Sequence, residues 1–103
     1  MYVIFDETQA EKLKEKYTVL RLDRVYVEEK DMHLQLFCVV GAGSISLDQI
    51  ITLESDVNLH EKMIDNLQKQ NYDFVAQSIE HLKGKFGGEI DSFYDEVSKR
   101  III

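Results

Sequence analysis

Apolar and polar positions alternate with a two-residue period through much of the first 40 residues, which is typical of β-strands. Residues 18–28 and 32–40 carry this pattern, and residues 2–5 predict a further short strand because they are aromatic and β-branched. The polar segment 28–31 separates the second run from the third, which predicts an antiparallel hairpin. Within residues 18–28 the parity of the apolar positions changes near Asp23, which predicts either a β-bulge or a strand covered on both faces.

A short helix is predicted between the first two strands. Asp6 can cap its first turn, and Gln9 follows at the spacing of a capping box. We expect this helix to reach about Lys16. Acidic and basic residues alternate along it, so most of its surface should face water.

The second half of the chain follows the helical period of 3.6 and predicts three helices. Ser55, Asp56 and Asn58 are all candidate N-caps of the first. The second covers residues 71–82. Residues 68–71 before it predict a tight turn or a kink, with Asn71 suited to the left-handed conformation. It should be central, with one apolar stripe and a second covered side at Phe74. The predicted stripe comprises Tyr72, Val75, Ala76, Ile79 and Leu82.

The third helix should follow the glycine-rich segment 84–88. Two acid-before-base pairs, Asp95–Lys99 and Glu96–Arg100, support it at the i,i+4 spacing. Its apolar stripe comprises Ile90, Phe93, Tyr94, Val97 and Ile101. Residues 45–53 are ambiguous between a fourth strand and a short helical turn that begins after Ser46 and runs into a brief extended piece. We favour the second interpretation.

These elements predict an α+β fold. A small, mainly antiparallel sheet of three or four strands would pack against a C-terminal layer of three helices. A chain of 103 residues predicts a single domain, residues 1–103, with a core large enough to need no disulfide.

Charge and composition exclude several classes of protein. The formal net charge of −7 opposes binding to nucleic-acid phosphates. The longest stretch without Asp, Glu, Lys or Arg is Met32–Leu47, and it is too polar for a membrane span. Residues 1–5 do not resemble a signal peptide. A single cysteine suits a reducing compartment, so we expect a cytoplasmic protein, in the host cytoplasm if a phage encodes it.

The segment from Cys38 to Ser46 begins like a dinucleotide-binding fingerprint, in which glycines let the backbone approach a pyrophosphate. Ser46 occupies the place of the third glycine, and neither a long helix nor a parallel strand is predicted after it. We therefore interpret the glycines as a turn that ends the strand, and we expect no cofactor.

No catalytic or metal-binding set is evident in the sequence. His33 and Cys38 are five positions apart on one strand, so they point to opposite faces and cannot form a local dyad. Asp56 and His60 have an i,i+4 spacing that can hold a metal, but no further ligand accompanies them, and Asp56 is better explained as a helix cap. We expect no metal site.

Aromatic and isoleucine side chains near the C-terminus are the features that most favour a binding function. Phe86 lies between two glycines and is predicted to be a surface anchor. Tyr94, Ile102 and Ile103 complete the predicted partner-binding set. The helical period accounts for Ile101 but not for the two isoleucines after it, which suggests that they pack on a neighbouring element or on a second subunit. We expect a homo-oligomer.

The stretch from Asn71 to Tyr94 resembles the C-terminal part of small uncharacterised proteins of marine T4-like phages. Residues 5–8 and 13–20 are similar to theirs as well. The resemblance implies a phage or marine microbial origin and carries no activity.

Three functions are therefore consistent with the sequence. The first is a non-catalytic protein-interaction module that self-associates, with an unknown protein partner. The second is an acidic inhibitor that mimics nucleic acid, although lysines interleave with the carboxylates of the first helix. The third is a small-ligand-binding protein or an enzyme that uses a cleft between the sheet and the helices.

Overall fold

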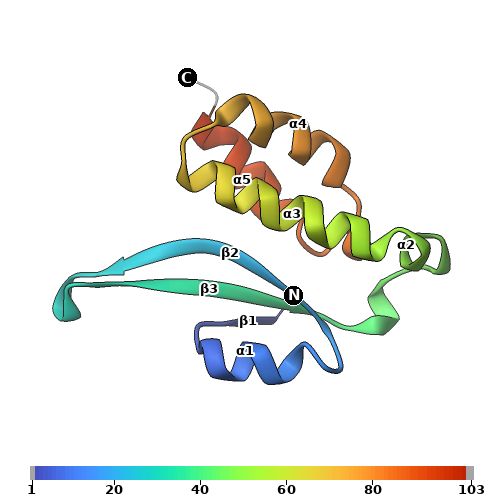
Figure 1. The fold of residues 1–103 in the computed structure, drawn as a ribbon, viewed down its shortest axis with the longest axis horizontal. Helices are drawn as coiled ribbons and strands as arrows, with labels where there is room; N and C mark the ends of the chain where they lie inside the picture. The colour runs from blue at the N-terminus through green and yellow to red at the C-terminus, as the bar shows by residue number, and fades with distance from the viewer. Residues whose placement is uncertain (1, 102–103) are drawn as a thin grey trace. The chain divides into compact units, whose positions relative to one another are not determined.

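The computed structural model describes residues 2–101, apart from the side chain of Ala42. The chain divides into two compact units, the first ending at Ala42 and the second beginning at Gly43. The first unit holds a three-stranded sheet and one helix, and the second holds the C-terminal helices (Figure 1). The α+β class is therefore confirmed, and the assignment of the whole chain to one domain stays a prediction.

The sheet of the first unit is antiparallel throughout. It comprises β1 (Tyr2–Ile4), β2 (Thr18–Val27) and β3 (Met32–Val40), in the order β1-β3-β2. All three strands lie where the sequence predicted them. The pairing of β2 with β3 shifts register between Arg21 and Arg24, so the predicted bulge is confirmed.

The hairpin between β2 and β3 closes through a short 3-10 turn, Glu28–Lys30. Asp31 follows it with a φ of 47°, a left-handed conformation that aspartate tolerates better than most residues. The hydroxyl of Tyr26 donates a hydrogen bond to the Asp31 carboxylate. This bond raises the pKa of Tyr26, because deprotonation would place two negative charges side by side.

Helix α1 (Glu7–Leu13) begins at the predicted cap. The Asp6 carboxylate accepts hydrogen bonds from the backbone N–H groups of Thr8 and Gln9 at 2.9 and 3.2 Å. The helix ends at Leu13, one turn earlier than the sequence predicted. Its single buried residue, Ala10, packs into a small core with side chains from all three strands. This core comprises Ile4, Ala10, Val19 and Phe37, with Leu13 and Val39 packed against it.

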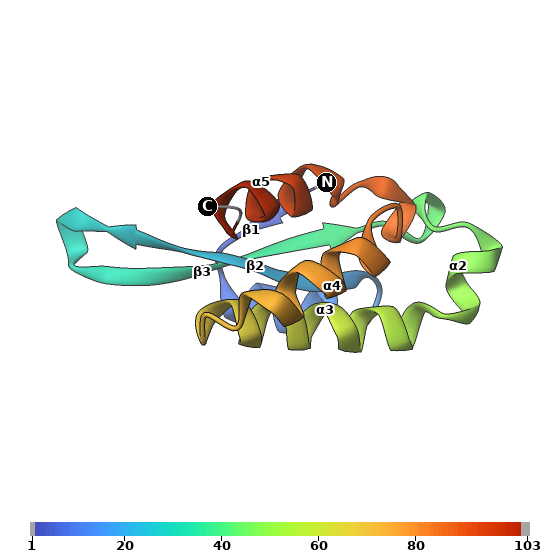
Figure 2. The same cartoon turned by 90° about the horizontal axis from the view of Figure 1, so that it is seen from above.

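The second unit contains four helices: α2 (Leu47–Ile51), α3 (Leu53–Gln68), α4 (Tyr72–Leu82) and α5 (Asp91–Ile101). Helix α3 runs beside α4, and α4 also contacts α5 (Figure 2). The three long helices were predicted. The short helical turn after Ser46 is confirmed as α2, but the extended piece after it is wrong, because α3 begins at Leu53.

The start of α3 differs from the prediction. Ser55, Asp56 and Asn58 all lie inside the helix, and Thr52 occupies the N-cap position. The Thr52 carbonyl accepts the N–H of Asp56 at 2.9 Å, so the i→i−4 hydrogen bonds of the helix begin before the predicted caps. Because α2 leads almost directly into α3, the first turn of α3 forms without a side-chain cap.

The buried face of α4 is rotated from the predicted stripe. Tyr72 and Ala76 are exposed, whereas Ser78 is buried and donates its hydroxyl to the carbonyl of Phe74 at 2.8 Å. Phe74 itself is half-buried, in accord with a second covered side. The remaining buried residues of the helix are Val75, Ile79 and Leu82, as predicted.

The turn between α3 and α4 also differs from the prediction. Gln70 takes the left-handed conformation, with a φ of 64°, in place of Asn71. Asn71 instead donates its backbone N–H to the Asn66 carbonyl at 2.9 Å and its side-chain amide to the Asn66 side chain at 3.0 Å. Asn71 is therefore the N-cap of α4, and the left-handed residue of the turn is Gln70, one position before the predicted one.

Candidate functional site

Helix α2 presents three large apolar side chains to solvent. Leu47, Ile50 and Ile51 are 77%, 49% and 81% exposed. They occupy positions i, i+3 and i+4, so they share one side of the helix. Leu47 and Ile51 exceed every other large hydrophobic residue of the described chain in exposure. We refer to these three residues as the α2 triad.

The turn before α2 fixes where the helix begins. Ser46 has an extended backbone, and its carbonyl accepts the N–H groups of Gln49 and Ile50, both at 3.0 Å. Its hydroxyl also accepts the N–H of Gln49, at 3.4 Å. Ser46 is therefore the N-cap that the sequence predicted.

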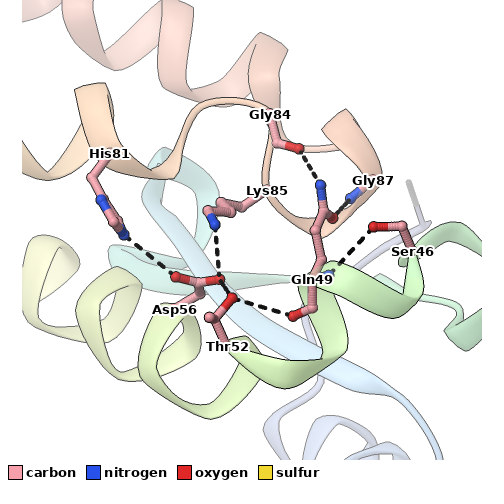
Figure 3. A network of polar contacts seen from close by, with 8 residues as sticks. All are labelled: Ser46, Gln49, Thr52, Asp56, His81, Gly84, Lys85 and Gly87. Atoms are coloured by element: carbon pink, nitrogen blue, oxygen red, sulfur yellow. Dashed lines mark hydrogen bonds and ion pairs between the residues drawn. The ribbon is translucent and has the colours of Figure 1, made fainter.

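Gln49 lies across the helix from the α2 triad and attaches α2 to the glycine-rich segment. Its side-chain nitrogen donates to the carbonyl of Gly84 at 3.0 Å, and its side-chain oxygen accepts the N–H of Gly87 at 3.0 Å (Figure 3). One amide thus satisfies a backbone acceptor and a backbone donor of the same segment. This pair of bonds holds the inner side of α2 while the triad stays in water.

A second set of polar contacts joins the start of α3 to α4 and to the glycine-rich segment. The carboxylate of Asp56 accepts the hydroxyl of Thr52 at 2.9 Å. His81 Nε2 lies 3.6 Å from one carboxylate oxygen, and Lys85 Nζ lies 3.7 Å from the other (Figure 3). Asp56 is 3% exposed, so Thr52, His81 and Lys85 supply the polar surroundings of a carboxylate that water hardly reaches.

Asp56 is therefore not the helix cap that the sequence predicted. Its i,i+4 neighbour His60 contacts a different side chain, since His60 Nδ1 lies 2.8 Å from the buried hydroxyl of Tyr94. In residues 2–101 no three metal-ligating side chains come together. The spacing of Thr52 and Asp56, one helical turn apart, is a sequence signal for the Thr52 contact alone.

The predicted partner-binding residues fall into two groups. Phe86 and Tyr94 are 1% and 0% exposed, so the prediction of Phe86 as a surface anchor is wrong. Their rings surround His60, with centroid distances of 6.2 and 5.7 Å. Ile102 and Ile103 lie outside the described residues, and self-association through them stays a prediction.

The remaining sequence candidates lie in β3 and in the segment that follows it. Cys38 is buried in β3. His33 on the other face of β3 has its ring 5.1 Å from that of Tyr26. The glycines after β3 lead into a 3-10 turn, Ala42–Ser44, and then into the five-residue α2, so this segment differs from a dinucleotide-binding loop followed by a long helix.

The first unit has a shallow hollow of about 430 Å³ beside α1. Tyr2 and Tyr17 line it and are 62% and 44% exposed. The described residues that line it carry no charge. They are Tyr2, Gln9, Leu13, Tyr17, Val39 and Gly41, and we call this feature the tyrosine hollow.

Comparison with protein-family models, with curated proteins and with solved structures gave no match. No helix within residues 2–101 is both long enough and apolar enough to cross a membrane.

Proposed function

We propose that the protein is a non-catalytic protein-interaction module and that the α2 triad is its contact surface. The observation that carries this proposal is the exposure of Leu47 and Ile51, 77% and 81%, on a helix that is held from its other side. Single exposed hydrophobic residues are ordinary, but three on one helical face form a patch that costs solubility unless a partner covers it.

The attachment of α2 favours recognition of a partner. A five-residue helix is too short to persist alone in water. Here Gln49 fixes α2 to Gly84 and Gly87 before any partner arrives. A partner would therefore not have to order the helix on binding, and the free energy of contact would not be spent on that ordering.

Site-specific photocrosslinking tests this function. A benzophenone side chain at Ile51 should give one discrete adduct in an extract of the native host. The wild-type chain should compete for that adduct, and a Leu47→Asp chain should not. The matched control carries the benzophenone at Phe5, which is 66% exposed in the first unit. An Ile51 adduct that is absent, or that the Leu47→Asp chain competes for equally well, would contradict the proposal.

Folding provides the second half of this test. Leu47 and Ile51 are so exposed that Leu47→Asp and Ile51→Asp should change the free energy of unfolding by no more than about 0.5 kcal/mol. Urea denaturation of each variant measures this change. Loss of binding without loss of stability separates a contact surface from a core position.

The tyrosine hollow supports a second candidate, which is the binding of a small neutral ligand. Its volume of about 430 Å³ falls within the range of small-molecule sites, and the Gln9 amide offers a polar group beside apolar walls. A fragment screen by NMR should shift the Tyr2 and Tyr17 ring signals together. Hits that leave both rings unshifted would remove this candidate.

A further inference from the structure

We infer that the α2 triad is recognised by a different protein, through a short apolar groove bordered by lysine or arginine side chains. This inference rests on the proposed function, because it identifies the chemistry of the partner at the same surface. Three observations carry it: the spacing of the triad, the charge around it and the length of the helix.

The triad has the spacing with which a helix enters a groove. Side chains at i, i+3 and i+4 point the same way and can fill adjacent pockets. Helix α2 has five residues and is therefore about 7.5 Å long. At Thr52 the backbone leaves the helical conformation, with φ −103° and ψ 7°, before α3 begins. The matching groove is consequently short, about one and a half helical turns.

The surroundings of the triad are acidic. Asp48 is exposed beside Leu47, and Glu54 is exposed one turn beyond Ile51. From Asp31 to Glu61 the sequence contains neither lysine nor arginine. Lys85 approaches α3 from the glycine-rich segment, but its ammonium group faces Asp56 at 3.7 Å. Complementary charge on a partner would therefore be positive at the rim of the groove.

The same charges disfavour a second copy as the partner. A symmetric dimer brings one surface against itself, so Asp48 and Glu54 would meet the Asp48 and Glu54 of the other copy. Like charges brought close together weaken an interface, so these carboxylates disfavour binding of a second copy. A groove with a basic rim satisfies both carboxylates, whereas the identical surface satisfies neither.

The size of the triad sets the expected strength of the complex. A stable interface buries about 800 Å² on each partner, and three side chains provide only part of that area. We therefore expect a short-lived complex with a dissociation constant in the micromolar range.

Two designed helical hairpins with the same apolar groove test the inference. One has lysines along the rim of the groove and the other has glutamates. Each is titrated into the ¹⁵N-labelled full chain, and binding is followed by backbone amide shifts. The lysine hairpin should bind at least tenfold more tightly and should shift residues 46–54. Ile51→Asn should abolish these shifts, and the matched control Phe5→Asn should keep them.

Two kinds of result would overturn the inference. Equal binding of both hairpins, or binding of neither, contradicts a groove with a basic rim. A dimer in sedimentation velocity that Ile51→Asn converts to monomer identifies a second copy as the occupant. The proposed function survives either result if the Ile51 photocrosslink persists, and it fails on its own if that crosslink is absent.

Discussion

At the scale of single residues, Gly87 sets how closely the glycine-rich segment approaches the turn before α2. Its φ of 69° lies in the left-handed region, and a Cβ at this position would lie 2.0 Å from the carbonyl oxygen of Ser44. Its N–H also donates to Gln49. The absence of a side chain is therefore what permits the backbone contact and the hydrogen bond together.

Alanine substitutions at three glycines separate conformational strain from close contact. Gly43→Ala meets open space and should change the unfolding free energy by less than about 0.5 kcal/mol. Gly84 also has open space but a φ of 86°, so Gly84→Ala should cost about 1–2 kcal/mol. Gly87→Ala combines a positive φ with a close contact to the Ser44 carbonyl, so it should lower the unfolding free energy by roughly 3 kcal/mol or more. Urea denaturation measures all three. A Gly87→Ala variant as stable as Gly84→Ala would contradict the close contact.

Asp56 and Phe86 show which residue roles sequence patterns miss. Asp56 was one of three candidates for a cap, and two of its partners, His81 and Lys85, come from distant parts of the chain. No local period can reveal such a contact. Phe86, between glycines, was expected at the surface, but its φ of 56° belongs to a tight turn in which its ring packs against His60.

At the scale of elements, the strands and the three long helices follow from local chemistry. Alternation located β2 and β3, and the change of parity near Asp23 located the bulge, because each strand has two faces of different polarity. Helical periodicity located α4 and α5. The α2 triad was not predicted, because three apolar residues in a five-residue helix resemble core until the fold shows which side is covered.

The attachment of α2 can be tested by replacing the hydrogen-bond donor of the Gln49 side chain with an acceptor. Gln49→Glu replaces the donating nitrogen with an oxygen that would face the carbonyl of Gly84. The amides of α2 should then exchange with solvent about tenfold faster, in keeping with the loss of roughly 1.4 kcal/mol. Hydrogen exchange by NMR measures this rate. Gln77→Glu on the exposed side of α4 is the control, and unchanged exchange in α2 would show that the amide does not hold it.

A pH-dependent contact joins the end of α4 to α5. Lys83 Nζ lies 2.6 Å from Asp95 Oδ1. This hydrogen bond, with the charge of Asp95, raises the pKa of Lys83 above its ordinary value of 10.5. A raised folded-state pKa means that the contribution to stability is complete below pH 10.5 and is lost as the pH rises through the folded-state value.

An NMR titration of the Lys83 side chain checks this direction. The midpoint should lie above 10.5 in the wild type and move back down in Asp95→Asn. Both side chains are about half exposed, at 53% and 51%, so water screens the pair and the effect on global stability should be small. A midpoint that is the same in both proteins would show that the contact does not persist in solution.

At the scale of the whole molecule, the net charge of −7 affects how quickly partners arrive. An acidic chain attracts a basic partner over distances of about one Debye length, which shortens as salt is added. The chain-wide charge and the acidic border of the α2 triad have the same sign. Electrostatic steering and local recognition therefore favour the same kind of partner.

This effect predicts a salt-dependent association rate. Binding of the lysine-rimmed hairpin should slow roughly tenfold between low and high salt, with a smaller change in the dissociation rate. Stopped-flow measurements give both rates. A hairpin with a glutamine rim is the matched control and should be nearly insensitive to salt. Equal salt dependence of the two would mean that the charge of the chain does not steer the encounter.

The lack of lysine and arginine around α2 determines which methods can detect its partner. Trypsin cuts only after these residues, so it leaves Asp31 to Lys62 as one peptide that contains β3, α2 and half of α3. Amine-reactive crosslinkers have no lysine to attack there. A proteomic survey based on lysine chemistry would therefore return no contact at the α2 triad even when a partner is bound, whereas a photoreactive group placed on α2 would report it.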